Sequence, residues 1–125
     1  EMFNETNYLS AIAVDFDANG DIAMTNTTVV AAPGTGYRIV LYGVNMSMAG
    51  STAATAGRLY LTNGTKASAT ILWQLRSQGL YPVQSDMSFS PGVKLDANTA
   101  LKITGEEDSA QAYAFGTVYY RIERT

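Results

Sequence analysis

Apolar residues recur at every second position along most of this chain, and turn-forming residues interrupt them about every ten residues. Side chains of a β-strand point alternately to the two faces of a sheet, so this period predicts strands that bury one face. No long segment shows the three-and-four spacing of an amphipathic helix. The pattern therefore predicts an all-β fold.

The alternating segments are numerous enough to build two layers. About eight of them can be separated, which suits an antiparallel β-sandwich, jelly-roll-like, with two packed four-stranded sheets. A chain of 125 residues has room for one such domain. We expect a polar N-terminal arm over residues 1–7 and a single sandwich domain over residues 8–125. The predicted strands cover residues 8–16, 21–31, 37–48, 58–61, 70–75, 85–89, 100–104 and 111–123.

The strand predicted over residues 37–48 is apolar on two sides. Ile39 and Leu41 share one face, whereas the other face carries the set Val40, Tyr42, Val44, Met46 and Met48. A strand that is apolar on both sides is typically buried on both. We therefore expect its second face to meet another element or another subunit.

The last predicted strand divides its residues by size. Ala112, Ala114 and Gly116 fall on one face, where small residues let a neighbour pack closely. The opposite face carries aromatic residues, which dominate protein cores and interfaces. We predict that an oligomer or partner interface includes Tyr113, Phe115, Tyr119 and Tyr42. Trp73 shares a face with two aliphatic residues, so we expect it in the core.

Turn chemistry separates the strands. Asn19-Gly20, Asn63-Gly64 and residues 33–36 (PGTG) predict tight turns. Ser90-Pro91-Gly92 is expected to end a strand, because proline cannot donate to a sheet ladder. We expect residues 48–57 to form a surface loop and residues 105–109 to form an acidic one.

Composition excludes several kinds of chemistry. The chain has no His and no Cys, so Ser–His–Asp triads, Cys–His dyads and ordinary zinc sites are impossible. Its formal net charge is −3 and the sequence holds no run of basic residues, which argues against nucleic-acid or anionic membrane partners. We therefore expect a protein that is not an enzyme and needs no cofactor.

Two acidic segments are the remaining candidates for chemistry. Asp15, Asp17, Asn19 and Asp21 match the opening of a calcium-binding loop, but Asn26 stands where a closing Glu is required. A hairpin turn carrying acids is the favoured interpretation of that segment. The adjacent Glu106, Glu107 and Asp108 include the pair of carboxylates that glycoside hydrolysis needs, although a solvated charged loop is the simpler reading.

Three segments give the chain a family resemblance. They are residues 29–44 (VVAAPGTGYRIVLYGV), 90–101 (SPGVKLDANTAL) and 116–122 (GTVYYRI). This style of sequence resembles small virion proteins of tailed bacteriophages, over roughly residues 29–123, and it includes no catalytic residue. The resemblance implies a jelly-roll capsid decoration (cement) or head-fibre protein, often a homotrimer, located on the capsid surface and made in the cytoplasm of the bacterial host. Its partner would be the major capsid protein or another virion protein.

A second hypothesis uses the same fold differently. Eight Tyr and one Trp are enough aromatic rings for a sugar-stacking platform. A carbohydrate- or receptor-binding module, such as a tail-fibre or adhesin tip, is therefore the alternative to a capsid protein. The fold class alone does not choose between them, because sandwiches carry many functions.

Overall fold

The computed structural model describes residues 10–16, 26–50, 56–78, 83–107 and 112–125. Within these ranges, no helical segment has the length and apolar character of a membrane span. The strands are β1 (Ser10–Phe16), β2 (Thr27–Val30), β3 (Tyr37–Gly50), β4 (Ala56–Asn63), β5 (Ile71–Gln78), β6 (Val83–Lys94), β7 (Leu101–Glu107) and β8 (Ala112–Arg124), with one short 3₁₀ helix, η2 (Ser68–Thr70).

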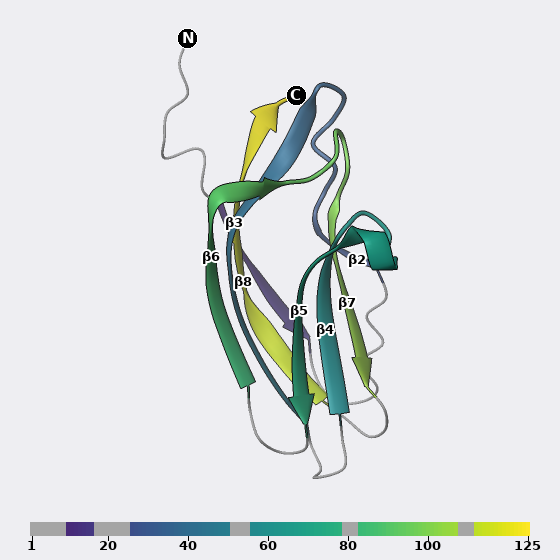
Figure 1. The fold of residues 1–125 in the computed structure, drawn as a ribbon, viewed down its shortest axis with the longest axis vertical. Coiled ribbons are helices and arrows are strands. Elements are labelled where there is room, and N and C mark those ends of the chain that lie inside the picture. Colours follow the sequence, from purple (N-terminus) through teal and green to yellow (C-terminus); the bar gives the residue numbers. More distant parts are fainter. Residues whose placement is uncertain (1–9, 17–25, 51–55, 79–82, 108–111) are drawn as a thin grey trace.

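The strands form two antiparallel sheets that pack face to face (Figure 1). The first sheet has the order β1-β8-β3-β6 and the second has the order β2-β7-β4-β5. Strand β1 pairs with β8, β2 with β7, β3 with β6 and β4 with β5, so the chain pairs with itself like one long antiparallel hairpin. Successive pairs of this hairpin lie alternately in the first and the second sheet. This wrapping is the jelly roll, so the predicted fold class is confirmed.

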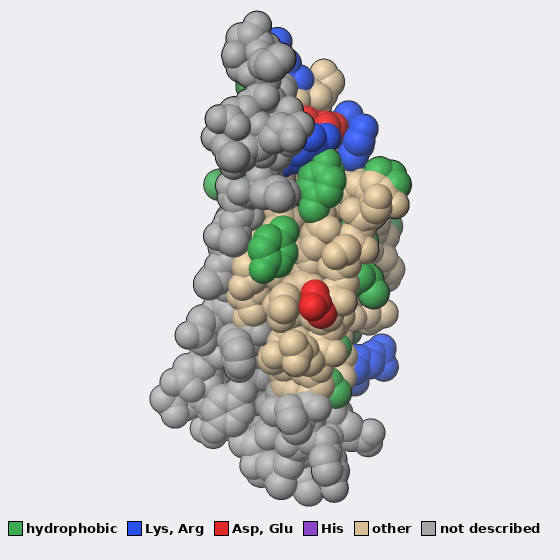
Figure 2. Space-filling model, turned by 90° about the vertical axis from the view of Figure 1, so that its left-hand side faces the viewer, with side chains coloured by type: hydrophobic (Ala, Val, Ile, Leu, Met, Phe, Trp, Pro, Cys, Tyr) green, Lys and Arg blue, Asp and Glu red, His purple; other side chains and the backbone are tan. Residues whose placement is uncertain are grey.

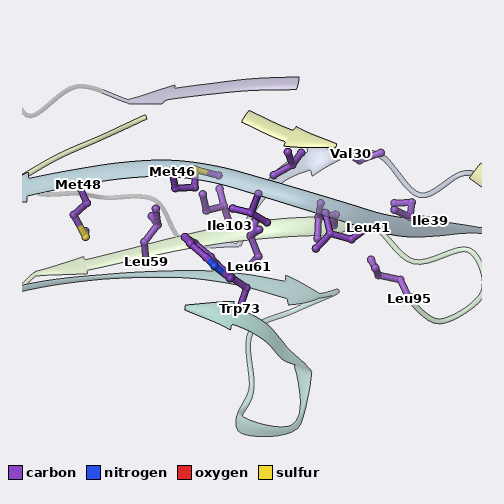
Figure 3. Close-up of a cluster of buried hydrophobic side chains, with 13 residues drawn as sticks. Val30, Ile39, Leu41, Met46, Met48, Leu59, Leu61, Trp73, Leu95 and Ile103 are labelled. Atoms are coloured by element: carbon purple, nitrogen blue, oxygen red, sulfur yellow. The ribbon is translucent and has the colours of Figure 1, made fainter. Parts of the chain in front are cut away.

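The core lies between the two sheets, as Figure 3 shows. Strand β3 supplies the largest share of it, and β4 and β7 face β3 with alternating aliphatic residues. Trp73 is buried in this layer, as predicted. Burying one aliphatic side chain of this size contributes roughly 1.5–3 kcal/mol, so the layer dominates folding. Its labelled members are Val30, Ile39, Leu41, Met46, Met48, Leu59, Leu61, Trp73, Leu95 and Ile103.

A β-bulge at Tyr42 explains why the sequence of β3 is apolar on two sides. The register shifts between Leu41 and Gly43 against both neighbouring strands, so Tyr42 is an extra residue. Before the bulge, odd-numbered positions such as Ile39 and Leu41 face the core; after it, even-numbered positions such as Val44 do so. The apolar residues on the two sides of β3 therefore belong largely to one core-facing stripe that changes phase. Val40, which faces the opposite side, is buried as well, and contact of that side with another subunit stays a prediction.

Strand β6 differs from the prediction at its C-terminal half. Ser90-Pro91-Gly92 does not end the strand, which continues to Lys94. The pairing with β3 passes from Val93 directly to Ser88, so the proline lies in an irregular stretch that leaves the ladder and rejoins it. Gly92 fits there because a Cβ at its position would lie 2.5 Å from Val40 Cγ1.

Other boundaries move as well. Residues 105–107 belong to β7 and residues 48–50 to β3, so these parts of the two predicted loops are strand. Of the strand expected over residues 21–31, only Thr27–Val30 forms a strand among the described residues. The predicted N-terminal arm over residues 1–7 and the Asn19-Gly20 turn lie outside the described residues.

Residues 29–44 and 90–101 contact each other through the turn before β3 and the turn after β6. Gly34 has a φ of +109° in the turn before β3, and its amide donates a 2.8 Å hydrogen bond to the Asn98 side-chain oxygen. The Asn98 amide in turn donates to the Tyr37 carbonyl at 2.8 Å. Asn98 itself has a φ of +50°, a conformation that Asn tolerates better than most residues. These two hydrogen bonds therefore hold the turn at Gly34 against the turn at Asn98.

Gly116 in β8 provides a test of the packing between β8 and β3. A Cβ at this position would collide with the Asn45 carbonyl and would lie 2.5 Å from Met46 Sδ and 2.7 Å from Met46 Cα. We expect Gly116→Ala to lower the free energy of unfolding by about 3 kcal/mol, because the colliding atoms are mostly backbone. Urea denaturation measures this loss. Gly43→Ala is the matched control: its Cβ would lie 3.3 Å from the Met87 carbonyl, so a loss as large as that of Gly116→Ala would contradict the explanation.

Candidate functional site

The outward-facing side of the first sheet carries exposed aromatic and charged side chains. The strand register places alternate residues of β3, β6 and β8 on it. Figure 2 shows this side of the molecule, with charged side chains gathered at its upper end and apolar ones below them. We call this surface the open face. Its described side chains are Arg38, Tyr42, Asn45, Ser47, Gln84, Asp86, Ser88, Lys94, Thr117, Tyr119, Arg121 and Glu123. Val40 faces the same side but is buried.

Two of the four predicted interface residues come together on the open face. Tyr119 is 40% exposed, and a Cβ built on Gly43 would lie 3.4 Å from its ring, so the ring covers that glycine. Tyr42, the bulge residue, lies beside it with the Arg121 guanidinium 5.1 Å from its ring centroid. A cation at this distance over an aromatic ring is attracted to its face.

The other two predicted interface residues are placed by their backbone alone. The register pairs Tyr113 with Ala49 and Phe115 with Ser47. No register shift occurs between these positions and Tyr119, so strand alternation assigns positions 113, 115 and 119 to the same side of β8. Their role in an interface stays a prediction.

A cluster of charges spans three strands at one end of the open face. Glu123 of β8 accepts a 2.8 Å hydrogen bond from Arg38 Nε of β3 and a 3.2 Å bond from Arg121 Nη2. Lys94 Nζ of β6 lies 3.5 Å from the same carboxylate. Three cations therefore surround one anion. We call Arg38, Lys94, Arg121 and Glu123 the basic cluster. The sequence has no run of basic residues, but the sheet brings these ones together.

The cluster controls the ionisation of its only acid. Partial burial raises the pKa of Glu123, but the Arg38 hydrogen bond and the charges of Lys94, Arg38 and Arg121 together hold it below its ordinary value of 4.5. Glu123 is therefore ionised at neutral pH, and the formal charges of these four side chains sum to +2.

The outward side of the second sheet is different because its centre is covered. Tyr60, Thr62 and Thr104 point outward, yet all three are buried. The segment that follows β4 folds over them, with Lys66 Nζ 4.8 Å from the Tyr60 ring centroid. Asn26 holds the segment after β4 in place against the second sheet. Its amide donates a 2.9 Å hydrogen bond to Thr104 Oγ1, and its side-chain oxygen accepts a 2.6 Å bond from the Lys66 amide.

Of the three acidic candidates for catalysis, the structure describes the side-chain contacts of Glu106. Glu106 lies 3.2 Å from Lys66 Nζ and 3.9 Å from Arg58 Nη1 on the covered side of the second sheet. Glu107 ends β7, and Asp108 lies outside the described residues. Glu106 therefore forms ion pairs with two basic side chains, which is typical of a structural carboxylate at a protein surface.

The predicted calcium loop is only partly visible. Asp15 lies in β1, where its backbone pairs with Phe115, whereas Asp17, Asn19 and Asp21 lie outside the described residues. The part of the chain that is described contains no group of three or more His, Cys, Asp or Glu that could hold a metal ion. The loop therefore stays a prediction from the sequence.

The pKa of Glu123 leads to a testable pH dependence. Because its pKa is lowered on folding, the unfolded chain binds its proton first, and the stability that the ionised group contributes is lost as pH falls from about 4.5 through the folded pKa. We expect Glu123→Gln to cost about 1–2 kcal/mol near pH 7 and much less near pH 3. Urea denaturation at both pH values measures this. Glu106→Gln, whose side chain is 39% exposed, is the control with a smaller loss, and equal losses at both pH values for Glu123→Gln would contradict the role of its charge.

Comparisons with known proteins concern the fold. No family model matches the chain, and no curated protein is significantly similar in sequence. Among solved structures, it is similar to the Tobacco streak virus coat protein, with 10% identity, a TM-score of 0.38, and coverage of 92% of this chain and 86% of that one. A chain of the Cyanophage Pam1 capsid asymmetric unit gives 17% identity, a TM-score of 0.42, and coverage of 90% and 82%.

A third similar structure is not from a virus. Eiger TNF from S. frugiperda has 16% identity, a TM-score of 0.37, and coverage of 90% of this chain and 85% of that one. With identities no higher than 17% and TM-scores no higher than 0.42, these likenesses carry no argument about function. The order and pairing of the strands nevertheless identify this chain as an all-β jelly roll with one open sheet face.

Proposed function

We propose that this chain is a structural virion protein of a tailed bacteriophage, which decorates and stabilises the capsid as a homotrimer through protein–protein contacts. The observation that carries the proposal is the open face, with its exposed tyrosine, its bulge tyrosine and its arginines. Tyr and Arg are enriched at protein interfaces and among the residues that dominate binding energy. The proposal assigns the chain no catalytic role.

The size of the open face suits such a role. Three strands about 4.8 Å apart and ten residues at about 3.3 Å each give roughly 480 Å² in projection. A stable interface buries about 800 Å² on each partner, which is of the same order. Cement proteins need complementary surface and no chemistry, and a sheet whose outward side chains are anchored by the core provides a rigid surface of that kind.

The alternative function is a carbohydrate- or receptor-binding module. The specific observation in its favour is the ring of Tyr119, which is exposed next to Tyr42 and charged groups. Aromatic rings with a few polar neighbours also suit sugar stacking. The two functions differ in what binds, so one set of variants can separate them.

Binding to phage heads tests the proposal. We expect Tyr119→Ala to weaken binding to heads of the phage whose genome encodes this chain by at least about tenfold, because it removes an aromatic anchor from the open face. Co-sedimentation with purified heads measures the affinity. Tyr37→Ala is the matched control, since Tyr37 is 38% exposed and lies at the far end of β3.

Two results would reject the proposal. The first is an unmodified chain that ignores phage heads but binds specific sugars on a glycan array, which would support the alternative. The second is an equal loss of head binding in Tyr119→Ala and Tyr37→Ala, which would show that the open face has no special part in docking.

A further inference from the structure

The turn Asn63-Gly64 follows the core-facing part of β4, and the proposed function makes no use of it. Asn followed by Gly is the pair of residues at which an Asn side chain most readily loses its amide, because glycine has no Cβ to hinder attack by its backbone nitrogen. Gly64 has a φ of +78°, so the turn also depends on glycine at this position. Both residues are half-buried, which leaves them in contact with water.

Deamidation at this pair forms one bond and breaks another. A hydroxide ion removes the proton of the Gly64 nitrogen, which then attacks the side-chain carbonyl carbon of Asn63. The side-chain nitrogen of Asn63 takes a proton from water and leaves as ammonia, so that a succinimide ring remains. Water opens this ring at either carbonyl and yields aspartate or isoaspartate. The net reaction consumes water and releases ammonia, and it needs no other reactant.

The folded turn restrains the attacking nitrogen. Gly64 N donates a 2.9 Å hydrogen bond to the carbonyl of Ala100, the residue before β7. A proton in such a bond is removed by base after the bond opens, as in amide hydrogen exchange. The Gly64 carbonyl is held as well, because the hydroxyl of the buried Thr62 donates to it at 2.7 Å. Gly64 is therefore fixed on both sides of its Cα.

The Asn63 side chain is restrained from another direction. Its oxygen accepts a 3.1 Å hydrogen bond from the amide of Asp96, in the segment after β6. Asn63 is also the last residue of β4 and pairs with Leu101 of β7. Side chains of a strand stand roughly perpendicular to the sheet, whereas the Gly64 N–H points across to Ala100. The two reacting groups therefore meet only when the turn opens.

We propose that Asn63 is a deamidation site that the native turn protects and that reacts through local opening of this end of β4. The inference does not depend on the proposed function. Isoaspartate adds an extra carbon to the backbone between this residue and Gly64, which displaces the Gly64 nitrogen from the Ala100 carbonyl. A chain that has reacted therefore cannot close the turn as before, and each opening that leads to reaction is recorded irreversibly.

The test compares the full chain folded in buffer with the same chain unfolded in guanidinium chloride, both at about pH 8.5 and about 37 °C. We expect Asn63 to convert at least about tenfold more slowly in the folded chain, because reaction then waits for an opening that costs free energy. Trypsin cleavage after Arg58 and Lys66 isolates Asn63 in one peptide, separate from the other Asn-Gly pair at residues 19–20. Mass spectrometry with chromatography of this peptide measures both products.

A variant examines the bonds of the turn directly. Thr62→Val removes the hydroxyl that holds the Gly64 carbonyl and keeps nearly the same volume. We expect the folded-state rate, divided by the unfolded-state rate of the same variant, to rise at least about threefold. Thr117→Val, the same substitution on β8 of the first sheet, is the control, and we expect a change of less than about 1.5-fold.

Hydrogen exchange of the Gly64 amide is a second measurement that needs no variant. We expect the fold slows its exchange by a factor within about threefold of that for Asn63 conversion, since both follow the same opening.

Four results would overturn the proposal. Equal conversion rates in the folded and the unfolded chain would show that the turn gives no protection, and an unfolded chain that does not convert at Asn63 would remove the site. A Gly64 amide that exchanges as fast as in the unfolded chain would show that the turn is not held closed. Equal effects of Thr62→Val and Thr117→Val would show that the bonds of this turn do not control the reaction.

Discussion

Burial of one apolar stripe of β3 against the second sheet is the constraint on which the rest of the structure depends. This strand pairs with β8 on one side and β6 on the other, and it supplies five of the thirteen buried residues of the core. Its stripe changes phase at Tyr42, since the bulge adds one residue opposite consecutive residues of β8, while β6 leaves the ladder over residues 89–92 and rejoins it. The change lets a fourteen-residue strand keep its inward side chains in a twisted sandwich.

The same bulge shapes the surface that we assign to binding. Without the extra residue, the alternation that buries Leu41 would continue inward at position 43, and Val44 would face outward. With it, the core continues through Val44 and Met46 while Tyr42 joins the outward side near Arg121. The bulge thus determines both which side chains of β3 pack in the core and which side chains lie on the open face.

The outward surfaces of the two sheets differ in exposure because a segment of the chain covers one of them. In the second sheet, the segment after β4 lies over Tyr60 and Thr62, held by Asn26 and Lys66. In the first sheet, tyrosines and charged groups remain accessible among the described residues. A surface already buried within the chain has little left to gain from a partner, which is why the open face carries the functional proposal.

Residue alternation alone determined the strand class, the approximate number of strands, the burial of Trp73 and the outward side of β8, because side-chain direction in a strand depends only on local backbone geometry. It did not reveal the bulge at Tyr42, since consecutive apolar residues from 39 to 42 do not show which of them faces the core. Nor did it locate the basic cluster: Arg38, Lys94 and Arg121 are far apart in the chain and meet only where β3, β6 and β8 pair. Tertiary pairing decided that, because the register between distant strands, rather than any local pattern, sets which charges share a surface.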